Sequence, residues 1–121
     1  MNRTFAVIDN SDAARCRSCD AVRELSSHGY QVIPVCPQMS NIEGLECVQA
    51  VTDIGEEVDI FCIFADPDYF ESIKDEIIKL HPDVVLVNPG SESNEAEREL
   101  VLEGITVNRG DTLEFLEFGM I

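Results

Sequence analysis

Short apolar segments alternate with amphipathic ones along most of the chain. A continuous apolar run such as Phe5-Ala6-Val7-Ile8 is typical of a strand covered on both faces. Five mainly apolar segments are predicted to be strands. They are residues 5–8, 31–35, 58–65, 84–87 and 105–107. Pro34 lacks an amide donor, so it should lie at the end of its strand or on an unpaired edge.

The segments between these strands have helical spacing. A helix is predicted over 18–27, with Ala21, Val22 and Leu25 on one side and Gly29 as a left-handed stop. Asp66 and Pro67 are suited to start the next helix. Its apolar stripe consists of Phe70, Ile73, Ile77 and Leu80.

A third helix should run from about 94 to 103 and end at Gly104, because Asn94 and Glu97 have the spacing of a capping box.

Residues 37–57 are the least regular part of the chain. We expect a short strand at 47–49 and a helical turn at 50–54. The apolar tail after Asp111 should form a helix that docks on the domain, although the same segment could form a homodimer contact.

Strands that alternate with helices predict βαβ units with right-handed crossovers. We therefore expect one α/β domain over residues 1–121, with a mainly parallel sheet of about five strands between two helical layers. Ligands of such sheets bind beyond the carboxyl ends of the strands, where the strand order reverses. The candidate site thus comprises residues 9–18, 35–37, 65–66 and 88–91.

Composition narrows the possible functions. The 121 residues include 24 acidic and 8 basic side chains, for a formal charge of −16. The basic residues cannot form an extended basic face, which argues against nucleic acid as a partner. No apolar run has the length of a membrane span, and we see no signal peptide, so a cytoplasmic protein is expected.

The acidic charge is unevenly distributed. Residues 1–38 contain four arginines and four acidic side chains, whereas residues 39–121 carry the whole surplus. The neutral part includes the loop at 9–18 between the first strand and the first helix. A phosphate there would meet helix amides, hydroxyl groups and guanidinium groups. The candidate phosphate ligands are Asn10, Ser11, Arg15, Arg17 and Ser18.

This loop has no glycine, so it is not a dinucleotide-binding G-x-G-x-x-G loop. Asp9 and Asp12 should repel an anion. A like charge about 4 Å from a phosphate would cost roughly 1–4 kcal/mol, depending on the local dielectric.

Further along, the stretch Gly29-Tyr30-Gln31-Val32-Ile33-Pro34-Val35-Cys36-Pro37 resembles the signature of the small CoA-binding domain proteins. These are stand-alone relatives of the nucleotide-binding domain of succinyl-CoA ligases. Weaker matches follow in the family's order, at Ile42-Glu43-Gly44, Asn88-Pro89-Gly90, Asn94-Glu95-Ala96 and Gly104-Ile105-Thr106-Val107. Cys36 stands at the family's Asn position and Asp9 at a family Gly.

The resemblance implies a Rossmann-like fold that binds CoA or a related adenine nucleotide without catalysing a reaction. It implies that the diphosphate lies at the first strand–helix loop. Pro34, Cys36 and Pro37 would then border the adenosine, and Asp66 would lie where the family often has a ligand-contacting residue.

Two alternatives remain open. The five cysteines are expected to be thiols, and Cys62 to be a buried apolar residue. Cys16 and Cys19 form a Cys-x-x-Cys pair at a helix start, which would suit a thiol redox centre or half of a zinc site. The chain could also be an interaction module that keeps only the fold.

Overall fold

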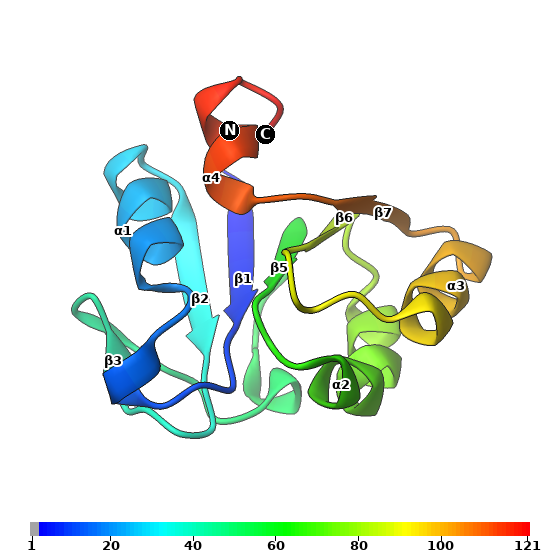
Figure 1. The fold of residues 1–121 in the computed structure, drawn as a ribbon, viewed down its shortest axis with the longest axis horizontal. Helices are drawn as coiled ribbons and strands as arrows, with labels where there is room; N and C mark the ends of the chain where they lie inside the picture. Colours follow the sequence, from blue (N-terminus) through cyan, green and yellow to red (C-terminus); the bar gives the residue numbers. More distant parts are fainter. Residues whose placement is uncertain (1–2) are drawn as a thin grey trace.

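The computed structural model describes residues 3–121 and contains a five-stranded parallel sheet (Figure 1). The strand order is β2-β1-β5-β6-β7, and a separate two-stranded hairpin is formed by β3 and β4. The strands are β1 Thr4–Ile8, β2 Gln31–Val35, β3 Asn41–Ile42, β4 Leu45–Glu46, β5 Ile60–Ile63, β6 Val84–Val87 and β7 Thr106–Arg109.

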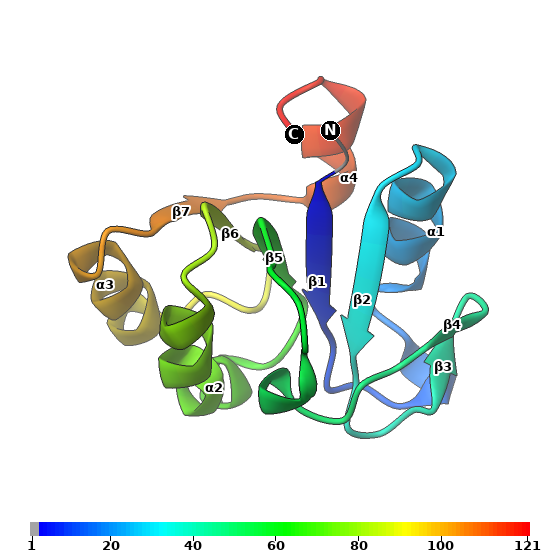
Figure 2. The ribbon, with the colours of Figure 1, turned by 180° about the vertical axis from the view of Figure 1, so that it is seen from behind.

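Helices cover both faces of the sheet. α1 contacts α4 on one face, and α2 contacts α3 on the other (Figures 1 and 2). The helical elements are η1 Ala13–Arg15, α1 Cys19–Ser27, η2 Val51–Asp53, α2 Pro67–Leu80, α3 Asn94–Leu102 and α4 Thr112–Glu117. The predicted three-layer, Rossmann-like α/β fold is confirmed.

The two-residue period of the strands divides the core between these faces. In β1, Phe5 and Val7 pack with the α1 layer, whereas Ala6 and Ile8 pack with the α2 layer. The α2 stripe is also as predicted, because Phe70 and Ile77 are fully buried. Cys62 is fully buried in the α1 layer, as expected.

Most turn and edge residues lie where the sequence predicts them. Gly29 ends α1 with φ +85° and Gly104 ends α3 with φ +86°. Pro34 lies in β2, one of the two edge strands of the five-stranded sheet. η2 lies within the helical turn predicted at 50–54.

Two local expectations were wrong. Residues 47–49 form no strand; only Val48 makes an isolated bridge, to Val35. The hairpin forms earlier because Glu43 and Gly44 both adopt positive φ, as a two-residue hairpin turn requires. The N-cap of α3 is Ser93 rather than Asn94, since Ser93 Oγ accepts from the amide of Ala96 at 3.2 Å.

The C-terminal segment forms α4, which docks against α1 as expected. Phe115 and Leu116 pack on the core, whereas Phe118 and Met120 are 72% and 65% exposed. A role of this segment in a homodimer stays a prediction.

The chain order places a topological switch point between β1 and β5. From β1 the chain crosses over α1 to β2 on one side, and β5 pairs with the other side of β1. The carboxyl ends of β1 and β5 therefore flank the crevice where such sheets bind ligands. Within residues 3–121, no helix combines the length and apolarity of a membrane span.

Candidate functional site

Asp9, the residue after β1, organises the loop that leads to α1. Its carboxylate accepts hydrogen bonds from the amide of Ser11 at 2.8 Å and from the amide and hydroxyl of Ser18 at 3.0 and 2.6 Å. The hydroxyl of Ser11 donates a further bond to it. Asp9 and Ser18 are fully buried.

This arrangement corrects the expectation that Asp9 faces the ligand. Its side chain turns back into the loop, and four donors compensate its charge. Hydrogen bonds to a carboxylate are stronger than those between neutral groups. The protein thus supplies its own anion at the start of α1, where a phosphate was expected. The Ser18 hydroxyl donates a hydrogen bond to Asp9, and Ser18 does not line the cavity beside this loop.

A cavity of about 470 Å³ opens beside this loop, at the switch point. Five of the nine residues named from the sequence line it: Asn10, Ser11, Arg15, Arg17 and Asp66. Asp12 and Gln38 complete the lining. The lining therefore carries two basic and two acidic side chains and is neutral, in a molecule with a formal charge of −16.

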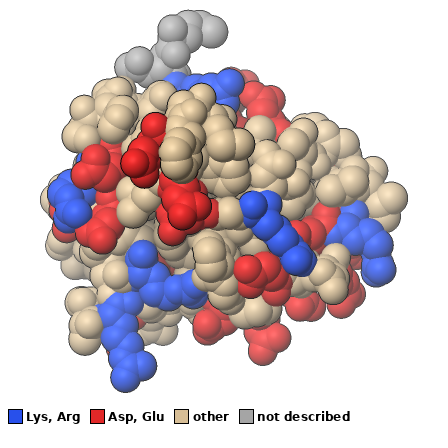
Figure 3. Space-filling view, turned by 45° about the horizontal axis from the view of Figure 1, so that its top comes forward, with Lys and Arg blue, Asp and Glu red and all other residues tan. Residues whose placement is uncertain are grey.

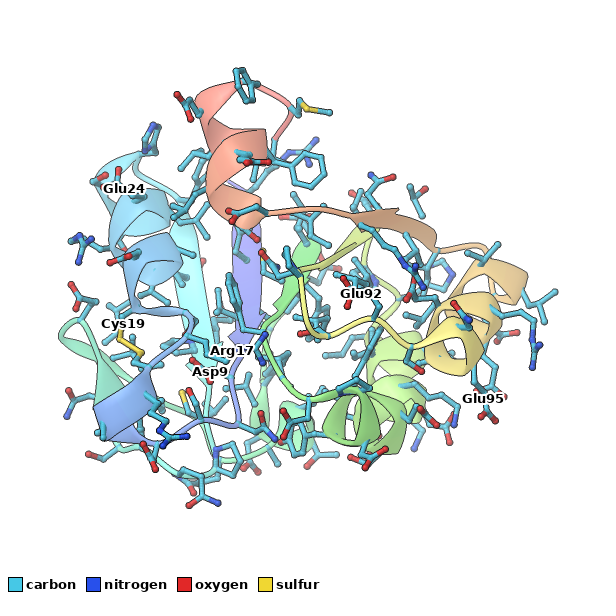
Figure 4. All side chains as sticks on the ribbon, in the orientation of Figure 1. Asp9, Arg17, Cys19, Glu24, Glu92 and Glu95 are labelled. Atoms are coloured by element: carbon cyan, nitrogen blue, oxygen red, sulfur yellow. A yellow bond between two sulfur atoms is a disulfide. The ribbon has the colours of Figure 1, made fainter. Side chains whose placement is uncertain are left out.

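Arg15 and Arg17 supply the positive charge of this cavity. Both are exposed, and neither forms an ion pair with a carboxylate among residues 3–121. Arg17 Nη2 instead donates to the carbonyl oxygen of Pro89 at 3.1 Å, across the loop after β6. Figure 4 shows Arg17 close to Asp9 at the end of β1. Guanidinium groups in this state remain available to an anionic ligand.

Gly90 makes room for the Arg17 side chain. A Cβ atom at this position would lie 3.1 Å from Arg17 Nη2, and the residue has φ +94°. The neighbouring Glu92 accepts a hydrogen bond from the Gly90 amide at 2.9 Å. The amides of Glu92 and Gly90 lower the pKa of the Glu92 carboxyl, with a smaller contribution from Arg109 and Arg17.

Asn10 and Asp66 connect the ends of β1 and β5. Asn10 Nδ2 donates to Asp66 Oδ2 at 3.2 Å, and the amide of Asp66 donates to Asn10 Oδ1 at 3.3 Å. Asp66 starts α2 as predicted, but its side chain makes no capping bond. The pair links the segments that follow the two strands, and both side chains line the cavity.

Four of the residues named from the sequence do not line the cavity: Ser18, Pro34, Cys36 and Pro37. Ser18, Pro34 and Cys36 are buried, and Pro37 is half-buried. Two lining residues, Asp12 and Gln38, were not named as ligands from the sequence, although Asp12 lies in the candidate segment 9–18 and was expected to repel an anion. Asp12 could have been recognised as the N-cap of η1, where it accepts from the Ala14 amide at 3.1 Å. Gln38 lies three residues after β2, just beyond the segment considered.

The prediction from the sequence that all five cysteines are thiols was wrong. Cys16 and Cys19 form a disulfide at the start of α1, with their Cα atoms 5.7 Å apart (Figure 4). The bond consumes both thiols, so the pair offers no thiolate for zinc in this state. Among residues 3–121, no three His, Cys, Asp or Glu side chains are grouped as metal ligands.

The other three cysteines are free and buried. Cys36 Sγ donates to Cys47 Sγ at 2.7 Å. Burial raises the pKa of all three thiols, that of Cys62 to about 12, and a hydrogen bond to Cys47 raises the pKa of Cys36 further. They are therefore poor nucleophiles near neutral pH.

A second cavity, of about 550 Å³, lies between the C-terminal halves of α2 and α3. Its lining includes Asp75, Glu99 and Glu103, with Lys79 as the basic residue. It lies toward the amino ends of the strands, where open parallel sheets do not bind ligands. We therefore place the candidate site at the smaller cavity beside the β1–α1 loop.

The surface charge agrees with a local rather than an extended cationic site. On the face shown in Figure 3, Lys and Arg side chains form small separate groups between acidic ones.

Comparison with known proteins identifies the family. A family model described as "CoA binding domain" matches residues 3–114. The uncharacterized protein YneT of Bacillus subtilis is 24% identical over 106 residues, which cover 88% of this chain and 78% of YneT.

Solved structures share the fold. An uncharacterized protein superposes with a TM-score of 0.89 and 26% identity, covering 100% of this chain and 99% of its own. A Thermus thermophilus protein, cell-free ID.343, has a TM-score of 0.79 and 30% identity, with 89% and 82% covered.

A larger enzyme contains a similar unit. The dinucleotide forming acetyl-coenzyme A synthetase 1 of Ca. Korarchaeum cryptofilum, in complex with phosphate and ADP, has a TM-score of 0.68 and 26% identity. The match covers 86% of this chain and 25% of the synthetase. The family match extends over the β1–α1 loop and the strands on both sides of the switch point, and this chain belongs to the CoA binding domain family.

Proposed function

We propose that this protein binds CoA or a related adenine nucleotide in the cavity beside the β1–α1 loop, and that the domain itself catalyses no reaction. One observation carries the proposal. In a chain of the CoA binding domain family, two guanidinium groups without carboxylate partners line a cavity at the switch point. The family match and these two guanidinium groups favour a phosphorylated ligand.

The phosphates would be held mainly by side chains. Asp9 already accepts from the Ser18 amide, so a phosphate cannot take its place at the start of α1. Arg15 and Arg17 would instead hold the diphosphate, with the fork geometry that suits phosphate oxygens. The Asn10 and Ser11 side chains line the same space, and Gln38 lies beyond the end of β2, where the adenosine is expected.

Binding without chemistry is proposed because the best candidate base is already occupied. The Ser11 hydroxyl is the one hydroxyl group in the cavity lining, and it donates to Asp9. Asp9 is buried and accepts three further bonds, from the amides of Ser11 and Ser18 and the hydroxyl of Ser18. Taking the Ser11 proton would weaken these bonds.

Two measurements test the proposal. Mass spectrometry of the small molecules released from freshly purified protein should detect CoA or an adenine nucleotide. Calorimetric titration should then show saturable binding of CoA and of ADP, and no binding of pantetheine, which lacks the diphosphate. Arg17→Gln should weaken CoA binding by about 10–100-fold, as for loss of one hydrogen-bonded charge.

Arg98→Gln is the matched control, because Arg98 is exposed on α3 and does not line the cavity. It makes the same change in net charge and should leave the affinity unchanged. Equal losses in the two variants would indicate a general charge effect and contradict the assigned site. If neither CoA nor ADP binds, the proposed function is wrong.

A further inference from the structure

The Cys16–Cys19 disulfide encloses part of the proposed phosphate site. It links the residue after η1 to the first residue of α1, and the ring that it closes contains Arg17 and Ser18. Arg15 directly precedes the ring. The crosslink therefore restricts the backbone that carries Arg17.

The same ring is attached to the Asp9 network. The amide of Arg17 donates to Ser11 Oγ at 3.3 Å, and Ser18 donates twice to Asp9. Cys16 Sγ lies 4.0 Å from Asp9 Oδ2. The disulfide and the hydrogen bonds together hold Arg17 where it reaches the Pro89 carbonyl oxygen.

Access distinguishes this pair from the other cysteines. Cys16 and Cys19 are half-buried, whereas Cys36, Cys47 and Cys62 are buried. A small dithiol can reach the disulfide without unfolding the core. Among the cysteines, the pair beside the cavity is thus the one exposed to thiol–disulfide exchange.

We propose that the redox state of Cys16 and Cys19 controls the affinity of this cavity for its nucleotide. The proposal rests on the proposed function. The reductant is a dithiol, such as the active-site pair of a thioredoxin-class protein. One of its thiolates attacks a sulfur of the disulfide and forms a mixed disulfide, and its second thiol then displaces the bound sulfur. The reductant leaves as a disulfide, and Cys16 and Cys19 gain the two electrons and two protons.

Reduction should weaken binding. Opening the ring gives the backbone at Arg17 and Ser18 freedom that it must lose again when a phosphate binds. Ordering two such residues corresponds to a loss of affinity of about tenfold or more. The oxidised protein is therefore the tighter nucleotide-binding form.

The experiment uses desulfo-CoA, which keeps the nucleotide and diphosphate of CoA but has no thiol to exchange with the protein. Oxidised protein is compared with protein reduced by dithiothreitol, from which the reductant is removed anaerobically. Calorimetry measures both affinities, and hydrogen exchange measures the protection of amides 10–18. We expect binding at least about tenfold weaker and faster exchange in the reduced protein, with both effects reversed on reoxidation.

The variant carrying both Cys16→Ser and Cys19→Ser is the control. It keeps the three buried cysteines, should bind like reduced wild type, and should not respond to dithiothreitol. Equal affinity of oxidised and reduced wild type would overturn the redox proposal and leave the proposed function standing. Absence of desulfo-CoA binding in both forms would overturn both. A response to dithiothreitol in the double variant would assign the effect to other cysteines and also overturn the redox proposal.

Discussion

At the scale of single residues, the Asp9 carboxylate holds the β1–α1 loop together through hydrogen bonds. Four donors converge on it in a fully buried position. The hydrophobic pattern places Asp9 after β1 but contains no information on whether its side chain turns outward or back. That choice depends on donors two and nine residues away, which meet only in the folded loop.

Asp9→Asn should therefore reduce the free energy of unfolding by about 2–4 kcal/mol, because the amide replaces an accepting oxygen with a donor that faces other donors. Urea denaturation measures the change. Asp12→Asn is the control, since Asp12 is exposed and its capping bond to Ala14 serves only η1. It should cost less than about 1 kcal/mol. Similar losses would show that the Asp9 network contributes little.

Cys62 provides a prediction of pH dependence. Burial raises the pKa of its thiol to about 12, from 9.0 for an exposed thiol. Above pH 9 the unfolded chain loses this proton while the folded chain keeps it, so stability falls as pH rises toward 12. The contribution of one thiol is about 1.4 kcal/mol per pH unit in this range.

Denaturation of wild type and Cys62→Ala at about pH 8 and about pH 11 isolates this contribution. The variant loses the Cys62 packing at both pH values, so the difference between the two pH values is the informative quantity. That difference should be smaller in the variant. Parallel losses in the two proteins would mean that Cys62 ionises equally in the folded and unfolded states.

At the scale of elements, apolar runs and helical stripes were sufficient to predict the five strands of the sheet and α1 to α4. Their ends were less certain where two adjacent residues suit the same role. Ser93 and Asn94 are both good N-caps, and the structure selects Ser93, which also receives support from Glu97 and Glu71. Asn94 instead accepts from Arg109 Nη2 at 2.7 Å.

The assignment of the cap is testable by two substitutions. Ser93→Ala should destabilise the protein by about 1 kcal/mol, as expected for loss of an N-cap. Asn94→Ala should cost less than about 0.5 kcal/mol, because its side chain makes an exposed contact. Thermal unfolding of both variants measures the difference. The reverse order would restore Asn94 as the cap.

The loop after β6 offers a second test at this scale. Gly90→Ala places a Cβ atom 3.1 Å from Arg17 Nη2 and forces Ala into φ +94°. Gly104→Ala has a similar backbone cost at φ +86° but contacts His81 rather than Arg17. Each should lose about 1–2 kcal/mol of stability, and Gly90→Ala alone should also weaken CoA binding.

Calorimetry on both variants, alongside thermal unfolding, distinguishes the two effects. Unchanged CoA affinity in Gly90→Ala would show that the position of Arg17 on the Pro89 loop does not matter for the ligand.

At the scale of the whole molecule, the alternation of strands and helices predicted the layers and the switch point, and hence the region of the site. Five of nine candidate residues line the cavity there. Pro34 and Cys36 do not, because a residue at the end of a parallel strand can be buried as easily as exposed. The oxidised state of Cys16 and Cys19 also could not be read from spacing alone, since it depends on the folded distance between them.

The net charge predicts that added salt raises the stability of the fold and lowers its affinity for nucleotide. Residues 39–121 hold the surplus of acidic groups, so mutual repulsion opposes the compact state and salt screens it. The melting temperature should rise between about 0.02 M and about 0.5 M KCl. Nucleotide binding should weaken over the same range, because salt also screens the attraction between the arginines and phosphate.

Thermal unfolding without ligand and CoA titration, each at both salt concentrations, test the two signs separately. Sucrose serves as a control that favours the compact state without screening charge, so it should not weaken CoA binding. A melting temperature that falls with salt would show that local ion pairs outweigh the overall repulsion.

The inward carboxylate of Asp9 has a consequence for how the domain would operate in a cell. Some proteins need a bound ligand to complete their folding. In this protein the Asp9 carboxylate already accepts the hydrogen bonds at the start of α1, so the loop is formed without a ligand. Empty and loaded molecules can then coexist as equally well-formed species. The fraction of ligand-bound protein would then follow the nucleotide concentration, as is required of a sensor rather than of a storage protein.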